Sequence, residues 1–135
     1  MCSTNYNIEF KSVSLPSCRG ETEIELTLSN DDSKWYILRR LGFGYSKEPT
    51  NNRFELNSEE VEEMIKHLSN VSLSVLPEWV EGLDGTTYSL KITCGLNSVV
   101  YKWWDELPKE YKALERVIEK LFSWADLDFK EMYEY

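Results

Sequence analysis

Apolar and polar residues alternate along several stretches of the chain, which is the pattern of a strand with one face in a core. Residues 6–10 alternate in this way, and the pattern recurs over residues 22–28 after a turn at residues 17–20. A third strand is predicted from residue 34 to about residue 43. Because the connections are short, these three strands are expected to form an antiparallel meander.

Further strands are predicted in the rest of the chain. A short strand is indicated at residues 54–56, and another at residues 71–75, where Pro77 limits its length. Residues 88–94 alternate clearly and follow a turn signal at Asp84-Gly85. Residues 99–104 are expected to return beside them as a hairpin, with the turn at Gly95 to Ser98.

Two helices are predicted from apolar residues that recur with helical spacing. The first runs over about residues 58–70, with Asn57 or Ser58 as its N-cap and Asn70 at its end. Its stripe consists of Val61, Met64, Ile65 and Leu68. The second runs over about residues 109–125, directly after Pro108, and has the longest stripe in the chain.

These elements predict one α+β domain, residues 1–135, in which two main helices, about 58–70 and 109–125, pack on an antiparallel sheet of five to six strands. The length of 135 residues fits a single domain, and hydrophobic residues make up 41% of the chain. That composition supplies enough apolar surface for a core and argues against disorder over most of the length.

The charge is acidic and unevenly distributed. The formal net charge is −9, of which residues 1–57 contribute −1 and residues 58–135 contribute −8. Such a field repels nucleic acid and anionic lipid and favours a cationic protein partner. The alternative is that the acidity serves solubility alone.

The compartment is predicted from what the sequence lacks. There is no run of about 18 apolar residues and no signal-peptide pattern at the N-terminus, so neither a membrane span nor secretion is expected. The three cysteines, Cys2, Cys18 and Cys94, form no CxxC pair. Free thiols in a reducing cytoplasm are the simplest interpretation. With a single histidine, His67, the chain offers no expected metal site, and no cofactor is predicted.

No catalytic motif stands out. Gly42-Phe43-Gly44 begins like a phosphate-binding loop but lacks the third glycine and the following helix. His67 lies off the apolar stripe of its helix and has no evident acid or nucleophile beside it. A carboxylate pair such as Asp105 and Glu106 is a weak sign of hydrolase chemistry, because sequence cannot show a shared cleft. No catalytic residue is therefore predicted.

Two groups of residues are candidates for partner binding. The first is the run of acids at the start of the first helix, Glu59, Glu60, Glu62 and Glu63. These glutamates are either a solvated helix start, favoured by the helix dipole, or an acidic docking patch. The second group is Trp104, Asp105 and Glu106. Adjacent strand residues face opposite sides, so Trp103 and Trp104 cannot both enter one core. Unless another layer covers that side, an aromatic patch stays exposed.

The segment from Leu83 to Pro108 carries a DGTxY…NS…WWxxxP pattern, from Asp84-Gly85-Thr86 through Asn97-Ser98 to Trp103-Trp104 and Pro108. It resembles small bacterial cytosolic proteins that are similar to immunity proteins of polymorphic or contact-dependent toxin systems. The resemblance covers about residues 83–125. It implies no catalytic residues, and it implies a role in neutralising a cognate toxin.

The resulting hypothesis is a non-catalytic, acidic protein-binding module, an immunity protein that occludes the active or substrate-binding site of a nuclease-type toxin. Carboxylates of the module would pair with the Lys and Arg residues that otherwise hold phosphates. Two alternatives stay open. One is a small carboxylate-dependent hydrolase, which requires two acids in one cleft. The other is a self-associating structural protein that uses an open sheet edge or an aromatic face.

Overall fold

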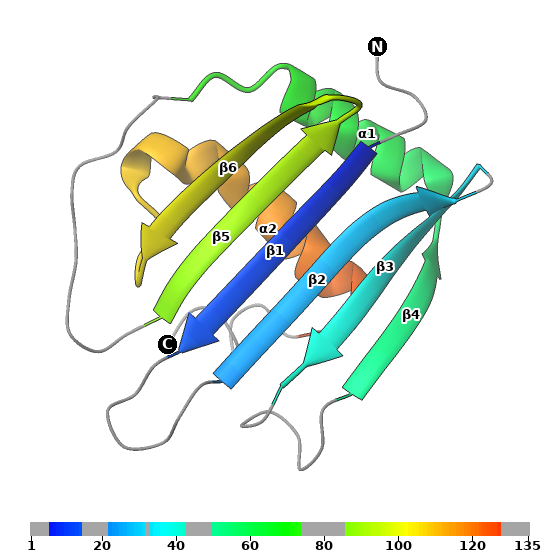
Figure 1. Ribbon diagram of the computed structural model, residues 1–135. Coiled ribbons are helices and arrows are strands. Elements are labelled where there is room, and N and C mark those ends of the chain that lie inside the picture. Colours follow the sequence, from blue (N-terminus) through cyan, green and yellow to red (C-terminus); the bar gives the residue numbers. More distant parts are fainter. Residues whose placement is uncertain (1–5, 15–21, 32, 43–49, 74–85, 128–135) are drawn as a thin grey trace.

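The computed structural model describes residues 6–14, 22–31, 33–42, 50–73 and 86–127 (Figure 1). In chain order the elements are β1 (Tyr6–Ser14), β2 (Thr22–Asp31), β3 (Lys34–Leu41), β4 (Thr50–Leu56), α1 (Ser58–Ser69), β5 (Thr86–Cys94), β6 (Asn97–Trp104), the 3-10 helix η1 (Lys109–Leu114) and α2 (Glu115–Trp124). None of the described helices is long and apolar enough to cross a membrane. The predicted α+β class is confirmed.

All six strands form one antiparallel sheet in the order β4-β3-β2-β1-β5-β6. The predicted meander of the first three strands is confirmed, and β4 extends it at one edge. After α1 the chain returns on the other side of β1, where β5 pairs with β1 and β6 forms the second edge. The β5–β6 hairpin turns at Gly95-Leu96, and Gly95 takes a positive φ of 63° there.

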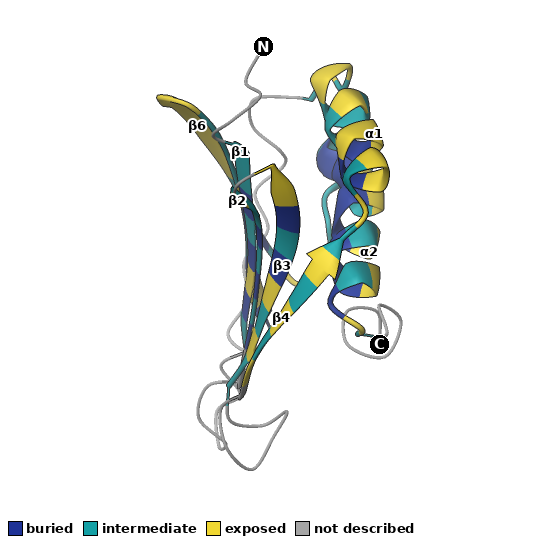
Figure 2. Ribbon diagram, turned by 90° about the vertical axis from the view of Figure 1, so that its right-hand side faces the viewer, coloured by how far each residue is buried: buried dark blue, intermediate teal, exposed yellow. Residues whose placement is uncertain are grey.

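The helices cover only one face of this sheet (Figure 2). Most of the side chains that point to the helices are apolar: Ile8 and Phe10 on β1 alternate with exposed or half-buried neighbours, as do the core residues of β2, and Ser12 and Thr86 are buried polar exceptions. Phe10 contacts Phe122 of α2 edge to face, with ring centroids 5.3 Å apart. One hydrophobic core therefore lies between the sheet and the helical layer.

The ends of α1 follow the sequence closely. Asn57 is the N-cap, and its side-chain oxygen accepts a hydrogen bond from the backbone N–H of Glu59 at 2.9 Å. Val61 and Met64 of the predicted stripe are buried. Asn70 is the C-cap, as predicted.

The predicted helix 109–125 is divided. Residues 109–114 are a 3-10 helix, and the α-helix spans Glu115–Trp124. Tyr111 donates its N–H to the carbonyl of Pro108 at 2.9 Å, a bond of the i to i−3 type. With three residues per turn, Tyr111 and Leu114 lie on the same side, and both are buried. The 3-10 helix thus buries the same apolar residues, Tyr111 and Leu114, whose spacing predicted a continuous α-helix.

The strand predicted at residues 71–75 is wrong for its described part. Residues 71–73 are not in a strand. The N–H of Val71 bonds to the carbonyl of Leu68 at 3.2 Å and so completes the end of α1. Val71 and Leu73 alternate with Ser72 because both are half-buried where the chain leaves the helix. Burial of two residues produced the strand-like pattern without a strand.

The expectation that all cysteines are free thiols is also wrong, because Cys94 is disulfide-bonded. Cys94 ends β5, where its Cα pairs with Tyr6 of β1. Several predicted features lie outside the described residues: the turns at residues 17–20 and 84–85, the segment Phe43-Gly44 of the glycine pattern, Pro77, and the other two cysteines, Cys2 and Cys18.

Candidate protein-binding surfaces

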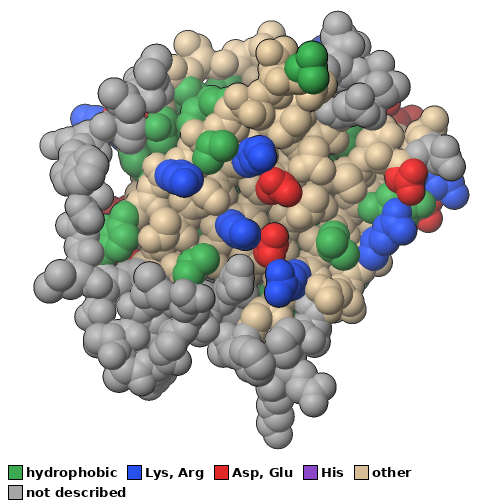
Figure 3. All heavy atoms as spheres, viewed as in Figure 1, with side chains coloured by type: hydrophobic (Ala, Val, Ile, Leu, Met, Phe, Trp, Pro, Cys, Tyr) green, Lys and Arg blue, Asp and Glu red, His purple; other side chains and the backbone are tan. Residues whose placement is uncertain are grey.

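The sheet face turned away from the helices, called the open face here, carries mixed charge (Figure 3). The strand register places its described charged side chains on β1–β6: Glu9, Lys11, Glu25, Asp31, Lys34, Arg40, Arg53, Glu55, Lys91 and Lys102. Among the side chains that the structure describes, basic ones outnumber acidic ones by six to four on this face, although the whole chain is strongly acidic. Over the middle of the sheet the hydrophobic side chains are separated from one another, whereas several adjoin at the upper left of the view, beside β6 (Figure 3).

Most acids of the open face are paired. Glu25 contacts Lys11 at 3.9 Å on one side and Arg40 at 3.3 Å on the other. At the β4 edge, Glu55 contacts Lys34 at 3.5 Å, and Asp31 contacts Arg53 at 3.7 Å. The Arg53 guanidinium also lies 3.7 Å from the centroid of the Tyr36 ring. The charges of this face are therefore largely engaged with each other.

The outer side of α1 is different. Glu59, Glu60, Glu62 and Glu63 are all exposed, and none of them forms an ion pair with any residue that the structure describes. Lys66 and His67, one turn further along, do not pair with them either. The predicted acidic run is thus on the surface, and no cation among the described residues pairs with it.

One aromatic residue that the sequence did not single out lies beside these acids. The indole Nε1 of Trp124, at the end of α2, donates a hydrogen bond to Oε2 of Glu60 at 3.3 Å. Trp124 is half-buried, so part of its ring is accessible. It adjoins the apolar stripe residues Leu121, Phe122 and Ala125, and no local pattern indicates that its indole reaches a residue of α1. We call Glu59, Glu60, Glu62, Glu63 and Trp124 the acidic α1 surface.

The second predicted group lies elsewhere. Trp104 is half-buried at the end of β6, with its side chain on the open face, while Trp103 is buried in the core. Asp105 and Glu106 follow it and are exposed, and the N–H of Asp105 bonds to the carbonyl of Thr86 at 2.8 Å. In Figure 1 the end of β6 and α1 lie at opposite sides of the molecule. The structure does not bring the two predicted groups together.

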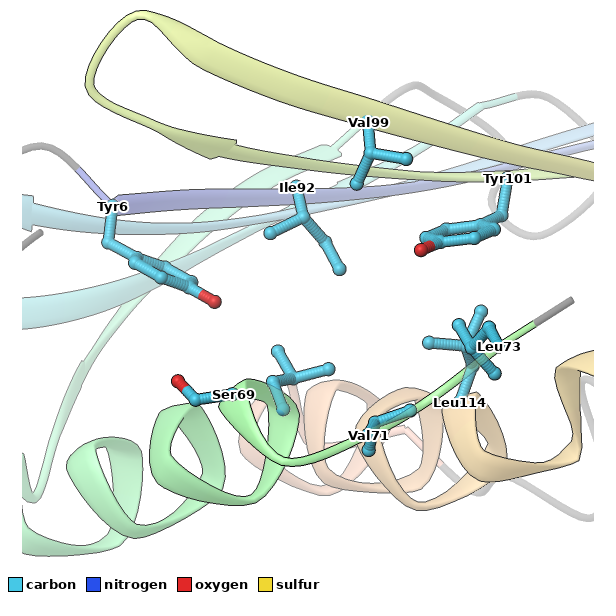
Figure 4. A pocket seen from close by; sticks show the side chains of 9 residues that line it. Tyr6, Ser69, Val71, Leu73, Ile92, Val99, Tyr101 and Leu114 are labelled. Carbon is cyan, nitrogen blue, oxygen red and sulfur yellow. The ribbon is translucent and has the colours of Figure 1, made fainter. Parts of the chain in front are cut away.

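A cavity of about 170 Å³ lies between the C-terminal end of α1 and the covered face of β1, β5 and β6 (Figure 4). Its walls are mostly apolar, and its polar groups are the hydroxyls of Tyr6, Tyr101 and Ser69. Burial raises the pKa of Tyr6 above its ordinary value. No Asp or Glu is among its lining residues. This cavity therefore does not supply the pair of acids that the hydrolase alternative requires.

Metal binding finds no support in the described part of the chain. No three His, Cys, Asp or Glu side chains within it are grouped closely enough to hold a metal ion. His67 is half-buried on α1, and neither Asp105 nor Glu106 forms an ion pair with it.

No protein-family model matches the chain, and no curated protein matches it. The resemblance of residues 83–125 to immunity proteins therefore has no independent test.

Proposed function

We propose that this chain is a non-catalytic protein-binding module that takes a cationic protein partner on its acidic α1 surface. The observation that carries the proposal is the set of four exposed glutamates that have no ion pair in the described structure, beside the accessible indole of Trp124.

Unpaired surface acids are well suited to a cationic partner because they give up no internal ion pair on binding. Their summed field also accelerates encounter with a basic protein. Trp124 supplies an aromatic anchor for such a contact, because tryptophans often contribute much of the binding energy at the centre of an interface. The open face lacks such unpaired acids in number, since most of its described acids already contact cations.

The resemblance of residues 83–125 supports a more specific form of the proposal, an immunity protein. The partner would then be a nuclease-type toxin whose phosphate-holding Lys and Arg residues are covered by the glutamates of α1. Trp104, Asp105 and Glu106 would form a separate contact, because they lie away from α1. They would take part only if the partner is large enough to reach around the sheet.

A cytoplasmic location belongs to this proposal, and the disulfide at Cys94 counts against it. Cytoplasmic thiols are kept reduced, so structural disulfides are rare there. Alkylating the thiols of the protein inside its source cells, before lysis, distinguishes the two cases. A cytoplasmic protein would have Cys94 alkylated, whereas a protein of an oxidising compartment would have it protected.

The binding surface is tested by affinity capture from a lysate of the source organism on three immobilised proteins. These are the wild type, the double variant Glu62→Lys/Glu63→Lys, and the control Glu9→Lys/Glu55→Lys on the open face. Both double variants change the net charge equally. A basic protein should be retained by the wild type and the control, released by salt, and lost from the α1 variant.

Binding of the purified partner should then weaken about tenfold or more for the α1 variant at low salt, with a smaller difference at high salt. Equal retention on all three proteins would remove α1 from the contact. Capture of no basic protein at all would count against the proposed function itself.

A further inference from the structure

The two edges of the sheet differ in how they are protected. Natural edge strands usually carry charges, prolines or bulges that prevent pairing with another chain. The edge strand β4 has Arg53 and Glu55 exposed on it. The edge strand β6 has eight residues, no proline and one charged residue, Lys102. Val99 and Val100 are 42% and 46% exposed, and Leu96 at the hairpin tip is fully exposed. The β6 edge is therefore the weakly protected one.

The backbone of β6 has a defined outward pattern. In an antiparallel pair, the N–H and C=O groups of alternate residues point to the neighbouring strand, and those between them point away. The N–H of Asp105 bonds to Thr86 of the β5 side, so Trp103, Tyr101 and Val99 bond toward β5 as well. The outward groups of β6 then belong to Ser98, Val100, Lys102 and Trp104. Among the described strands β6 pairs only with β5.

We propose that a second copy of this chain pairs with β6, antiparallel, about a two-fold axis through Val100. The two sheets would then continue as one sheet of twelve strands, with both helical layers on the same side. In this register Val100 lies opposite Val100 of the second copy on the open face. On the covered face Val99 lies opposite Tyr101 of the second copy, so apolar side chains meet on both faces.

The register also avoids a clash of like charges. Lys102, the one charged residue of β6, lies opposite Ser98 of the second copy, whose hydroxyl accepts a hydrogen bond readily. A two-fold contact requires a surface that is complementary to itself, and the segment from Asn97 to Trp103 meets this requirement around Val100. An axis through Lys102 would instead bring two ammonium groups together.

The extent of the contact predicts a weak dimer. Seven paired residues span about 23 Å of strand, at about 3.3 Å per residue. Edge pairing over this length buries less than the roughly 1,600 Å² of a standard stable interface. The dissociation constant of the dimer is therefore expected to be micromolar rather than nanomolar.

Sedimentation equilibrium over a concentration series from micromolar to millimolar tests the proposal. The wild type should pass from monomer to dimer within this range. Val100→Lys places two cations on the axis and should weaken dimerisation about tenfold or more. The matched control is Leu38→Lys, which changes an exposed apolar residue of the same face, 41% accessible, on a strand away from this edge. The control should dimerise as the wild type does.

A second variant keeps the proposal testable if Val100→Lys does not fold. Ser98→Lys brings an added cation opposite Lys102 of the second copy, twice per dimer, and should also weaken dimerisation while circular dichroism stays unchanged. Glu62→Lys/Glu63→Lys should leave dimerisation unaltered, which separates this proposal from the proposed function. A wild type that stays monomeric throughout, or equal effects of Val100→Lys and Leu38→Lys, would overturn the proposal.

Discussion

The two faces of the sheet are built from alternate residues of the same strands, yet they work differently. On the covered face the central positions of β2, Ile24, Leu26 and Leu28, have no accessible surface. On the open face the residues between them include Glu25, which is accessible and bridges Lys11 and Arg40. One face stabilises the fold by removing apolar surface from water, and the other exposes to water charged side chains that pair with each other.

The comparison teaches where function can reside. Substitutions on the covered face should cost stability, whereas those on the open face should cost little because exposed ion pairs contribute little. Neither face offers unpaired acids in number, so the acidic α1 surface stands apart from both. The following predictions test the contrast between the faces, beginning with the largest expected effect.

Truncation at the centre of the covered face should be the most damaging change. Leu26→Ala removes a fully buried side chain from the middle strand region and should lower the free energy of unfolding by about 2–5 kcal/mol. Thr27→Ala, the next residue on the same strand, faces the open side and should cost far less. Urea unfolding of both variants measures the difference. Similar losses would mean that the open face is also covered.

Removal of the Cys94 disulfide should cost about 2–4 kcal/mol. The strand register indicates which cysteine Cys94 can reach. Ser14 pairs with Thr86, eight residues or about 26 Å of strand from Cys94. The four further residues to Cys18 span at most about 14 Å, and a disulfide needs Cα atoms within roughly 7 Å, so we do not expect Cys18 to be the partner of Cys94. Cys2 is four residues from Tyr6, which lies directly opposite Cys94.

We therefore expect Cys2→Ala and Cys94→Ala to lower the free energy of unfolding equally, and Cys18→Ala to leave it unchanged. Thiol titration of the denatured, unreduced protein should find one free thiol among the three cysteines. Peptide mapping without reduction identifies the linked pair. Three free thiols would contradict the disulfide, and a Cys18–Cys94 peptide would contradict the register argument.

Arg39 is an exception to the apolar covered face, and its removal should have an intermediate effect. Its Nη1 donates to the carbonyl of Ala125, the C-cap of α2, at 2.9 Å. With the Asn52 amide in the orientation that satisfies both groups, Asn52 Oδ1 accepts from Nη2 at 2.6 Å. A cation at a helix C-terminus interacts favourably with the helix dipole, and its N–H groups can donate hydrogen bonds to the terminal carbonyls.

Arg39→Met keeps the aliphatic stem and should lower the free energy of unfolding by about 1–3 kcal/mol. The control is Arg40→Met, one residue further on β3, which loses only the exposed contact with Glu25 and should cost less than about 1 kcal/mol. Thermal unfolding of the two variants gives the comparison. Equal effects would show that the contact of Arg39 with α2 contributes no more than a surface ion pair.

On the open face, Glu25→Gln breaks two ion pairs at once and should still cost less than about 1 kcal/mol. The control Glu9→Gln removes an acid that has no ion pair within the described residues, and it should change stability less. At high salt the difference between the two variants should disappear, because exposed charges are screened. A salt-independent loss at Glu25 would mean that its contacts are shielded from solvent.

Much of the fold could be predicted from the sequence because the signals are local. The alternation over residues 6–10 and 22–28 predicts strands with one buried face, and Asn57 as a potential N-cap predicts the start of α1. The errors arose where the spacing of buried residues resembles that of a different element. Val71 and Leu73 alternate with Ser72 because both line the cavity at the end of α1. Tyr111 and Leu114 lie on the same side of a 3-10 helix, as they would nearly do in an α-helix.

The candidate site was predictable only in part. The exposure of Glu59, Glu60, Glu62 and Glu63 follows from their place in the first turns of an amphipathic helix. The proximity of Trp124 to Glu60 joins residues 64 positions apart, so it depends on how α2 packs beside α1. The charge pairing of the open face likewise depends on strand register. No local pattern contains that information, and the same holds for the separation of Trp104 from α1.

The smallest effect concerns two tyrosines of the covered side at high pH. Burial raises the pKa of Tyr6 above its ordinary value of 10.0, and burial, with smaller contributions from Tyr101 and Glu110, raises the pKa of Tyr111. The unfolded chain therefore loses these protons first as pH rises, and the stability present below pH 10 is lost above it. Urea unfolding between neutral pH and about pH 11 should show this decline, and Tyr6→Phe should make it shallower. An unchanged slope in the variant would show that the Tyr6 hydroxyl ionises as readily in the folded protein as in the unfolded chain, and hence that its end of the covered face is open to water.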